Sequence, residues 1–121
     1  MAAVVVIDDE EMNADALAFM LAAEGMSVRT ATNGEAGLQL IAEERPDLVI
    51  TDFMMPVMTG LEFAEKLRAN AATADIPVIL LSAAQANIGR QHPHLFNVVF
   101  EKPCHPPRII EAISQLLNDH K

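Results

Sequence analysis

The sequence has little cysteine: Cys104 is its single thiol. One thiol cannot form a disulfide within the chain and offers no spacing for a zinc site, so a secreted, disulfide-stabilised scaffold is excluded. No His and Asn arrangement suggests that Cys104 is an activated nucleophile, and we expect a spectator. A lone cysteine fits a reducing cytosol, which predicts a cytoplasmic protein.

Basic residues are also scarce, since eight Lys and Arg stand against seventeen Asp and Glu, for a formal charge of −9. Such a charge repels a phosphate backbone and an anionic lipid surface alike, so we expect no direct binding to nucleic acid or membrane.

Long apolar runs are missing as well. No stretch approaches the length of a membrane span, and the opening AAVVVI lacks the basic flank and cleavage pattern of a secretory signal.

The apolar residues that are present, 51% of the 121, suffice for one ordinary domain, and we expect a single domain over residues 1–121. Short runs rich in Val and Ile, without polar alternation, predict strands buried on both faces. These runs are Val4–Ile7, Met26–Arg29, Leu48–Thr51, Val78–Ser82 and Asn97–Phe100. Apolar residues at helical spacing predict helices between them. The expected helices are Asn13–Glu24, Gly34–Glu43, Gly60–Asn70 and Pro107–Leu117.

The stretch 83–94 is the least regular part of the pattern. Ala84–Asn87 could be helical, but Gly89, Pro93 and two histidines favour a short or frayed helix. Strand and helix alternate five times along the chain, which predicts an α/β fold with a parallel sheet covered on both faces. For five strands the common doubly wound, flavodoxin-like order is 2-1-3-4-5, and ligands bind at the carboxyl ends near its switch point.

Polar residues follow four of the five predicted strands and should meet at that edge of the sheet: Asp8 and Asp9, Asp52, Ser82, and Lys102. Three carboxylates this close repel one another, so either one of them keeps a proton or a cation is bound. Oxygen ligands without His or Cys favour a hard ion such as Mg²⁺. Alone, Asp52 would be a turn residue and Asp8 and Asp9 an acidic loop. Together with a lysine and a hydroxyl they indicate a phosphoryl site.

The stretches VVVIDDE, VITDFMMPVMTG, VILLSA and FEKP stand in this order at the ends of the expected strands. Asp52 is followed by Met55, Pro56 and Gly60 at the spacing of a family motif. Over essentially its whole length the chain resembles the receiver domain of two-component response regulators, including chemotaxis regulators. The histidines 92, 94, 105 and 120 share no face, so a histidine metal site is not expected.

The resemblance implies that Asp52 accepts a phosphoryl group from a histidine kinase or a phosphotransfer protein. It implies Mg²⁺ or Mn²⁺ as cofactor, bound by Asp9, Asp52 and the backbone carbonyl of Met54, with Asp8 acting through a water. Lys102 would contact the phosphoryl oxygens, its bond to Pro103 would be cis, and Ser82 would move inward after phosphorylation. The surface of the fourth helix, fifth strand and fifth helix would then signal to a target protein or output domain, or form a dimer. Such a module is not a turnover enzyme, beyond its own phosphorylation and slow dephosphorylation.

Two other functions remain open at this point. A phosphohydrolase of the haloacid dehalogenase type would carry a second aspartate two residues after the first, where this chain has Met54. A receiver-shaped interaction module that no longer takes phosphate would be expected to lack Asp52 or Lys102, and both are present.

The chain departs from the family at Val99, where most receivers carry Tyr or Phe, and at the Gly- and Pro-containing segment 83–96. The nearest aromatic is Phe100, so either the alignment is shifted at NVVFEKP and hides the usual arrangement, or this domain signals without that aromatic. We therefore expect normal phosphorylation with an unusual readout, and Val99→Ala should leave phosphorylation intact. Met54 and Ala84, without polar side chains, should position an attacking water poorly, so the aspartyl phosphate should persist.

Overall fold

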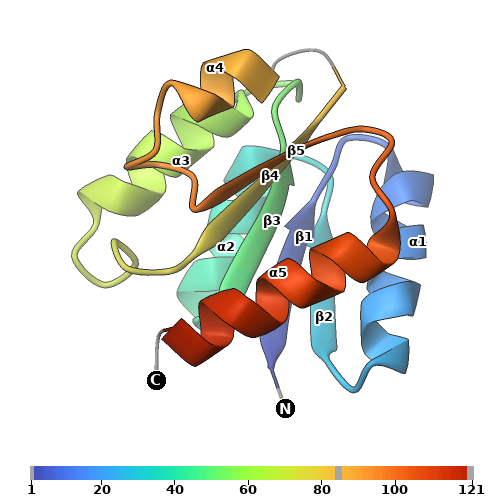
Figure 1. Ribbon diagram of the computed structural model, residues 1–121. Coiled ribbons are helices and arrows are strands. Elements are labelled where there is room, and N and C mark those ends of the chain that lie inside the picture. The colour runs from blue at the N-terminus through green and yellow to red at the C-terminus, as the bar shows by residue number, and fades with distance from the viewer. Residues whose placement is uncertain (1, 84–85, 120–121) are drawn as a thin grey trace.

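A computed structural model describes residues 2–83 and 86–119, in which strands and helices alternate along the chain (Figure 1). The strands are β1 (Ala3–Ile7), β2 (Ser27–Ala31), β3 (Leu48–Asp52), β4 (Val78–Ser82) and β5 (Val98–Glu101). The helices are α1 (Glu11–Ala23), α2 (Gly34–Glu43), α3 (Gly60–Ala69), α4 (Ala86–Arg90) and α5 (Pro106–Asp119). The strands form one parallel sheet in the order β2-β1-β3-β4-β5, which confirms the predicted flavodoxin-like topology.

Each face of the sheet is covered by its own set of helices (Figure 1). Successive strand residues point to opposite faces. In β1, for example, Val4 and Val6 pack with α1 and α5, whereas Val5 and Ile7 pack with α2 and α3. Both faces of the central strands are therefore apolar, which is why their sequences show no polar alternation.

The helix ends coincide with capping, glycine and proline residues in the sequence. The Asn33 side chain accepts a hydrogen bond from the Ala36 N–H at 2.8 Å and caps α2. Gly25 follows α1 with a φ of +89°, a conformation that glycine adopts without strain. Pro106 begins α5, where its missing N–H costs nothing. Within the described residues, no helix has both the length and the apolar character that crossing a membrane requires.

Several predicted boundaries are wrong by one or two residues. The errors of two residues are at the end of the second strand, which runs to Ala31 and not Arg29, at the start of the first helix, which begins at Glu11 and not Asn13, and at the end of the last helix, which runs to Asp119 and not Leu117. β2 is an edge strand whose Arg29 and Thr30 are polar, so a search for apolar runs ended it too early.

The fourth helix is short, as predicted, but its position differs from the prediction. It lies at Ala86–Arg90, two to three residues later than expected, and Gly89 lies inside it and does not end it. Gly89 is buried against the sheet, where a Cβ atom would lie 2.4 Å from Leu80 Cδ2, so a larger residue would require Leu80 to shift. The predicted start of this helix at Ala84 lies outside the described residues.

Candidate functional site

The alternation of the strands brings three charged side chains to one face of the sheet. Along β1, β3 and β5, the even-numbered apolar residues pack with α1 and α5; these are Val4, Val6, Leu48, Ile50, Val98 and Phe100. The next even positions, just as the strands end, are Asp8, Asp52 and Lys102. The same parity that buries the apolar residues therefore places two carboxylates and an ammonium together above the α1 and α5 face.

Lys102 bridges the two carboxylates. Its Nζ lies 3.1 Å from Asp8 Oδ2 and 3.3 Å from Asp52 Oδ2. The other oxygens also have partners, because Asp8 Oδ1 accepts the N–H of Glu10 at 2.9 Å and Asp52 Oδ1 accepts the N–H of Phe53 at 2.8 Å. Both carboxylates are thus fixed in position by the backbone that follows them.

Burial and charge act in opposite directions on these groups. Burial raises the pKa of Asp52, and the nearby Asp8 charge adds to this, while Lys102 and the Phe53 N–H oppose it. Burial alone would lower the pKa of Lys102, but its hydrogen bond to Asp8 and the charges of Asp52 and Asp8 outweigh burial and raise it. Lys102 is therefore held as a cation between two carboxylates.

Asp9 completes an acidic cluster with Asp8 and Asp52. One carboxylate oxygen from each of the three lies within 4.8 Å of the other two; Asp8 is buried, Asp9 exposed and Asp52 half-buried. Oxygen donors at this spacing, one of them facing solvent, suit a small hard cation that keeps part of its water shell. The residues present therefore fit Mg²⁺ or Mn²⁺, whose charge would offset the repulsion within the cluster.

A cavity of about 520 Å³ extends from this cluster between α1 and the loop that precedes α5. Asp8, Asp52 and Lys102 border it, and its remaining wall is largely apolar, including Ala16, Leu17, Met20, Cys104 and Ile109. Cys104, predicted to be a spectator, is part of this wall, and its Sγ lies 3.8 Å from the His105 carbonyl oxygen. The charged groups thus lie at the edge of a space large enough for a small ligand.

The other predicted features of the site are Ser82, Met54 and the bond between Lys102 and Pro103. Ser82 is buried at the end of β4, but by alternation it faces the opposite side of the sheet from Asp52. Met54, two residues after Asp52, exposes 58% of its surface. The bond between Lys102 and Pro103 is cis, as the resemblance implied.

The sequence alone does not decide whether Phe100 takes the place of the missing aromatic at position 99. The two residues face opposite sides of the sheet. Phe100 packs on the α5 side with the Arg108 guanidinium 5.2 Å from its ring centre, whereas Val99 packs with the α4 side. Phe100 therefore does not substitute for an aromatic at position 99. The close approach of the α4 backbone to Val99 at Gly89 was not predicted, because a glycine inside a short helix gives little local signal.

Comparison with known proteins agrees with this geometry. Residues 4–114 match the family model described as the response regulator receiver domain. The chain is 38% identical over 88 residues to the transcriptional regulatory protein AfsQ1 of Streptomyces coelicolor, which covers 73% of this chain but only 38% of that protein.

Solved structures share the fold across the whole chain. The signal receiver domain of a signal transduction histidine kinase from Syntrophus aciditrophicus superimposes with a TM-score of 0.91 and 25% identity, covering 100% of this chain and 93% of that one. The receiver domain of a sensor histidine kinase from Pseudomonas aeruginosa, described with a magnesium ion coordinated in its active-site cleft, has a TM-score of 0.87 at 19% identity and covers 97% and 98% of the two chains. The latter likeness shows the shared fold alone. With an acidic pocket of Asp8, Asp9 and Asp52 at the switch point of its sheet, the chain belongs to the response regulator receiver domain family.

Proposed function

We propose that this receiver domain accepts a phosphoryl group on Asp52 from the phosphohistidine of a histidine kinase or phosphotransfer protein. The observation that carries the proposal is the position of Asp52, half-buried between an acidic cluster and the Lys102 ammonium, 3.3 Å away. A carboxylate held in this way is a fixed acceptor, and phosphoryl transfer depends mainly on position and charge.

In the transfer step, one Asp52 oxygen forms a bond to phosphorus while the bond from phosphorus to the donor nitrogen breaks. The donor imidazole leaves and keeps the electron pair of that bond. Lys102, which already faces the Asp52 carboxylate, neutralises charge on the phosphoryl oxygens as they arrive. The Phe53 N–H fixes the carboxylate orientation throughout.

Mg²⁺ or Mn²⁺ would be held by Asp9, Asp52 and the Met54 carbonyl, with Asp8 acting through a water, and would supply positive charge that offsets the phosphoryl group and the carboxylates. The magnesium described for the Pseudomonas aeruginosa receiver domain supports this choice of cation. Ser82, buried at the neighbouring strand end, would then move its hydroxyl toward the phosphoryl group as the switch.

The partners would be a phosphodonor protein and a target protein or output domain reached through the surface of α4, β5 and α5, and the module would be cytoplasmic. An aspartyl phosphohydrolase is the rival function. It would need an acid near position 54 to protonate a leaving group, and the exposed Met54 cannot do this.

The test is to incubate the protein with Mg²⁺ and radiolabelled acetyl phosphate and to measure label that survives acid and is lost in base. Asp52→Asn should abolish this label. Asp15→Asn, at an exposed carboxylate of α1, is the matched control and should label as the parent does. Label that survives Asp52→Asn, or that never forms on the parent protein, would contradict the proposal.

A further inference from the structure

Two histidines lie side by side in the segment that joins α4 to β5. The ring centres of His92 and His94 are 5.7 Å apart, with an angle of 62° between the ring planes. The sequence predicted no shared face for the histidines. For this pair the prediction is wrong, because the chain turns over residues 93–95 and brings the two rings together.

The turn that carries the pair is anchored to the rest of the domain. The His92 carbonyl accepts hydrogen bonds from the N–H groups of Leu95 at 2.9 Å and Phe96 at 3.2 Å. The His92 N–H donates to the Gly89 carbonyl at 3.0 Å. Leu95 and Phe96 are buried, and the Leu95 carbonyl accepts a hydrogen bond from Arg68 Nη2 at 2.9 Å. The backbone around the pair is therefore held by contacts that do not use the imidazoles.

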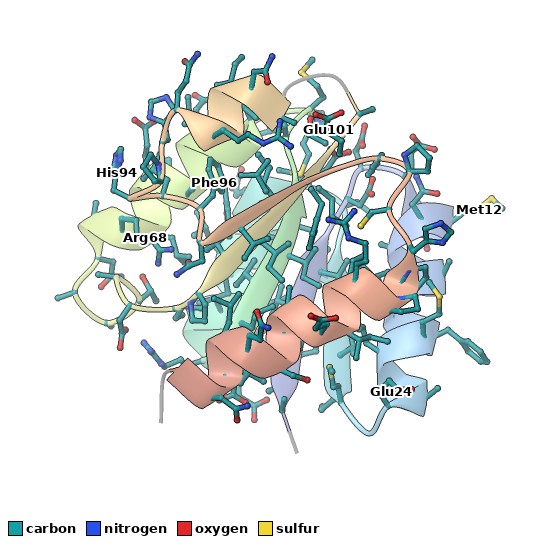
Figure 2. All side chains as sticks on the ribbon, viewed as in Figure 1. Met12, Glu24, Arg68, His94, Phe96 and Glu101 are labelled. Carbon is teal, nitrogen blue, oxygen red and sulfur yellow. The ribbon has the colours of Figure 1, made fainter. Side chains whose placement is uncertain are left out.

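Both imidazoles are accessible to a ligand. His94 is exposed and His92 is partly exposed. Figure 2 shows His94 at the outer edge of the molecule, whereas Phe96 of the same segment points toward the sheet. Among residues 2–83 and 86–119, no hydrogen bond or ion pair involves the ring nitrogens of either histidine. These nitrogens can therefore bind a ligand without breaking an existing contact.

The spacing of the two rings fits a shared zinc ion. Two imidazoles on one tetrahedral Zn²⁺ have ring centres about 5.2 Å apart, because each zinc–nitrogen bond is about 2.05 Å long. Neighbouring imidazoles in a square-planar copper or nickel site would have ring centres about 4.5 Å apart. The observed 5.7 Å is closer to the tetrahedral value. A small rotation of the exposed His94 side chain is enough to remove the difference of about 0.5 Å.

We propose that His92 and His94 bind one Zn²⁺ ion, with water in the two remaining coordination positions. The formal charge of −9 favours binding of a divalent cation. The pair precedes the amino end of β5, whereas the acidic cluster lies at the carboxyl ends of β1 and β3, at the opposite edge of the parallel sheet. The two sites therefore differ in place and in ligand chemistry, and the zinc site does not depend on the proposed function of Asp52.

The site would have a consequence for the surface of α4 and β5. A bound zinc ion adds two positive charges beside this surface, which we propose contacts a target protein or output domain. Recognition there would then depend on zinc as well as on the state of Asp52.

The test is a zinc titration of the isotopically labelled protein in excess Mg²⁺, followed by NMR of histidine side chains and backbone amides. The imidazole signals of His92 and His94 should shift together, with a single midpoint. The amide signals of Asp8, Asp9 and Asp52 report separately on any zinc that binds at the acidic cluster.

Substitution tests whether the two imidazoles bind the same ion. His92→Gln and His94→Gln should each weaken zinc binding at this site at least tenfold. The double variant should lose no more than either single variant, because one imidazole alone gains nothing from the high effective concentration of the other. His105→Gln, at an exposed histidine just before α5, is the matched control and should leave the midpoint unchanged.

Different midpoints for the His92 and His94 signals would overturn the shared site. So would single variants that each lose only half of what the double variant loses, or an equal loss in His105→Gln. Zinc that shifts only the signals of the acidic cluster in the parent protein would also contradict the proposal.

Discussion

The two faces of the sheet are packed in different ways. On the side of α1 and α5, a cavity of about 520 Å³ opens beside Asp52 and Lys102. On the side of α2, α3 and α4, Gly37 and Gly89 bring helix backbone so close that a Cβ atom would lie 2.4 Å from a buried side chain of the sheet. The open face has room for a phosphoryl group and a cation. The face covered by α2, α3 and α4 leaves no such space at Gly37 and Gly89, because helix backbone there approaches the buried side chains of the sheet closely.

Substitution of Gly37 by alanine should disrupt the packing on the side of α2, α3 and α4 and have the largest effect on stability. Its Cβ would lie 2.4 Å from Cδ1 of Ile7, which is fully buried. We expect a loss of about 2 kcal/mol in the free energy of unfolding, measured in urea, despite the better helix propensity of alanine. Gly34→Ala is the matched control and should cost less, because its nearest neighbour is the flexible Met58 side chain at 2.9 Å. Unchanged stability of Gly37→Ala would contradict close packing.

Replacement of Lys102 by methionine should lower the free energy of unfolding by removing the positive charge between Asp8 and Asp52. The raised pKa of Lys102 means that its stabilising effect is complete at neutral pH and is lost only as the pH rises through that pKa. Without Mg²⁺ at pH 7, the variant should lose about 1–2 kcal/mol, because Asp8 and Asp52 then repel each other without a counter-charge. The loss should shrink in acid as Asp52 takes up a proton. A loss of unfolding free energy that is the same at pH 7 and in acid would mean that Lys102 acts only by packing.

Substitution of Met54 by asparagine tests the chemistry at the mouth of the site. Met54 is exposed and cannot orient a water by hydrogen bonding, whereas an amide can. The half-life of the phosphorylated protein, followed by loss of label, should fall several-fold in Met54→Asn. Met54→Leu should keep the half-life of the parent protein. Equal half-lives of parent, Met54→Asn and Met54→Leu would show that this position does not control hydrolysis.

Asp52→Asn should have a smaller effect on stability, with the opposite sign. Because burial raises the pKa of Asp52, its ionised form destabilises the fold at any pH above that pKa. Without Mg²⁺, the variant should therefore be more stable at pH 7, by no more than about 1 kcal/mol. The gain should vanish as the pH falls through the raised pKa and the parent carboxyl becomes neutral. A gain that grows in acid would contradict this sign.

The smallest effect is expected for Ala16→Leu in α1. Ala16 lines the cavity, where added methyl groups have space. We expect unfolding free energy within about 0.5 kcal/mol of the parent, which contrasts with Gly37→Ala on the other face. Destabilisation as large as that of Gly37→Ala would show that the two faces are packed alike.

The sequence predicted the sheet order and the positions of the charged residues, because both follow from strand parity and from the ends of apolar runs. Asp8, Asp52 and Lys102 each extend a row of buried apolar residues by one step. Both signals lie within the strands themselves and do not depend on contacts with distant residues. The edge strand β2 was predicted less accurately. Because one of its edges has no neighbouring strand, it can contain polar residues such as Arg29 and Thr30, which a search for apolar runs does not include.

The short length of α4 was predicted, but its position was not, because the position depends on contacts with distant residues. Gly89 indicates a helix end when only its neighbours in the chain are considered. In the fold it is the residue that lets α4 approach Leu80 and Val99, which lie nine and ten residues away along the chain in either direction. Phe100, in contrast, follows strand parity: it lies in the same row as Lys102 and packs on the α5 side, where the Arg108 guanidinium lies 5.2 Å from its ring centre.

The most direct measurement of the central claim is to locate the phosphoryl group. After treatment with Mg²⁺ and acetyl phosphate, borohydride reduces an aspartyl phosphate to homoserine, which peptide mass spectrometry can assign to one position. We predict homoserine at position 52, and none at positions 8 and 9. Homoserine at Asp8 or Asp9, or its absence from a protein shown to be folded and loaded with Mg²⁺, would contradict the account.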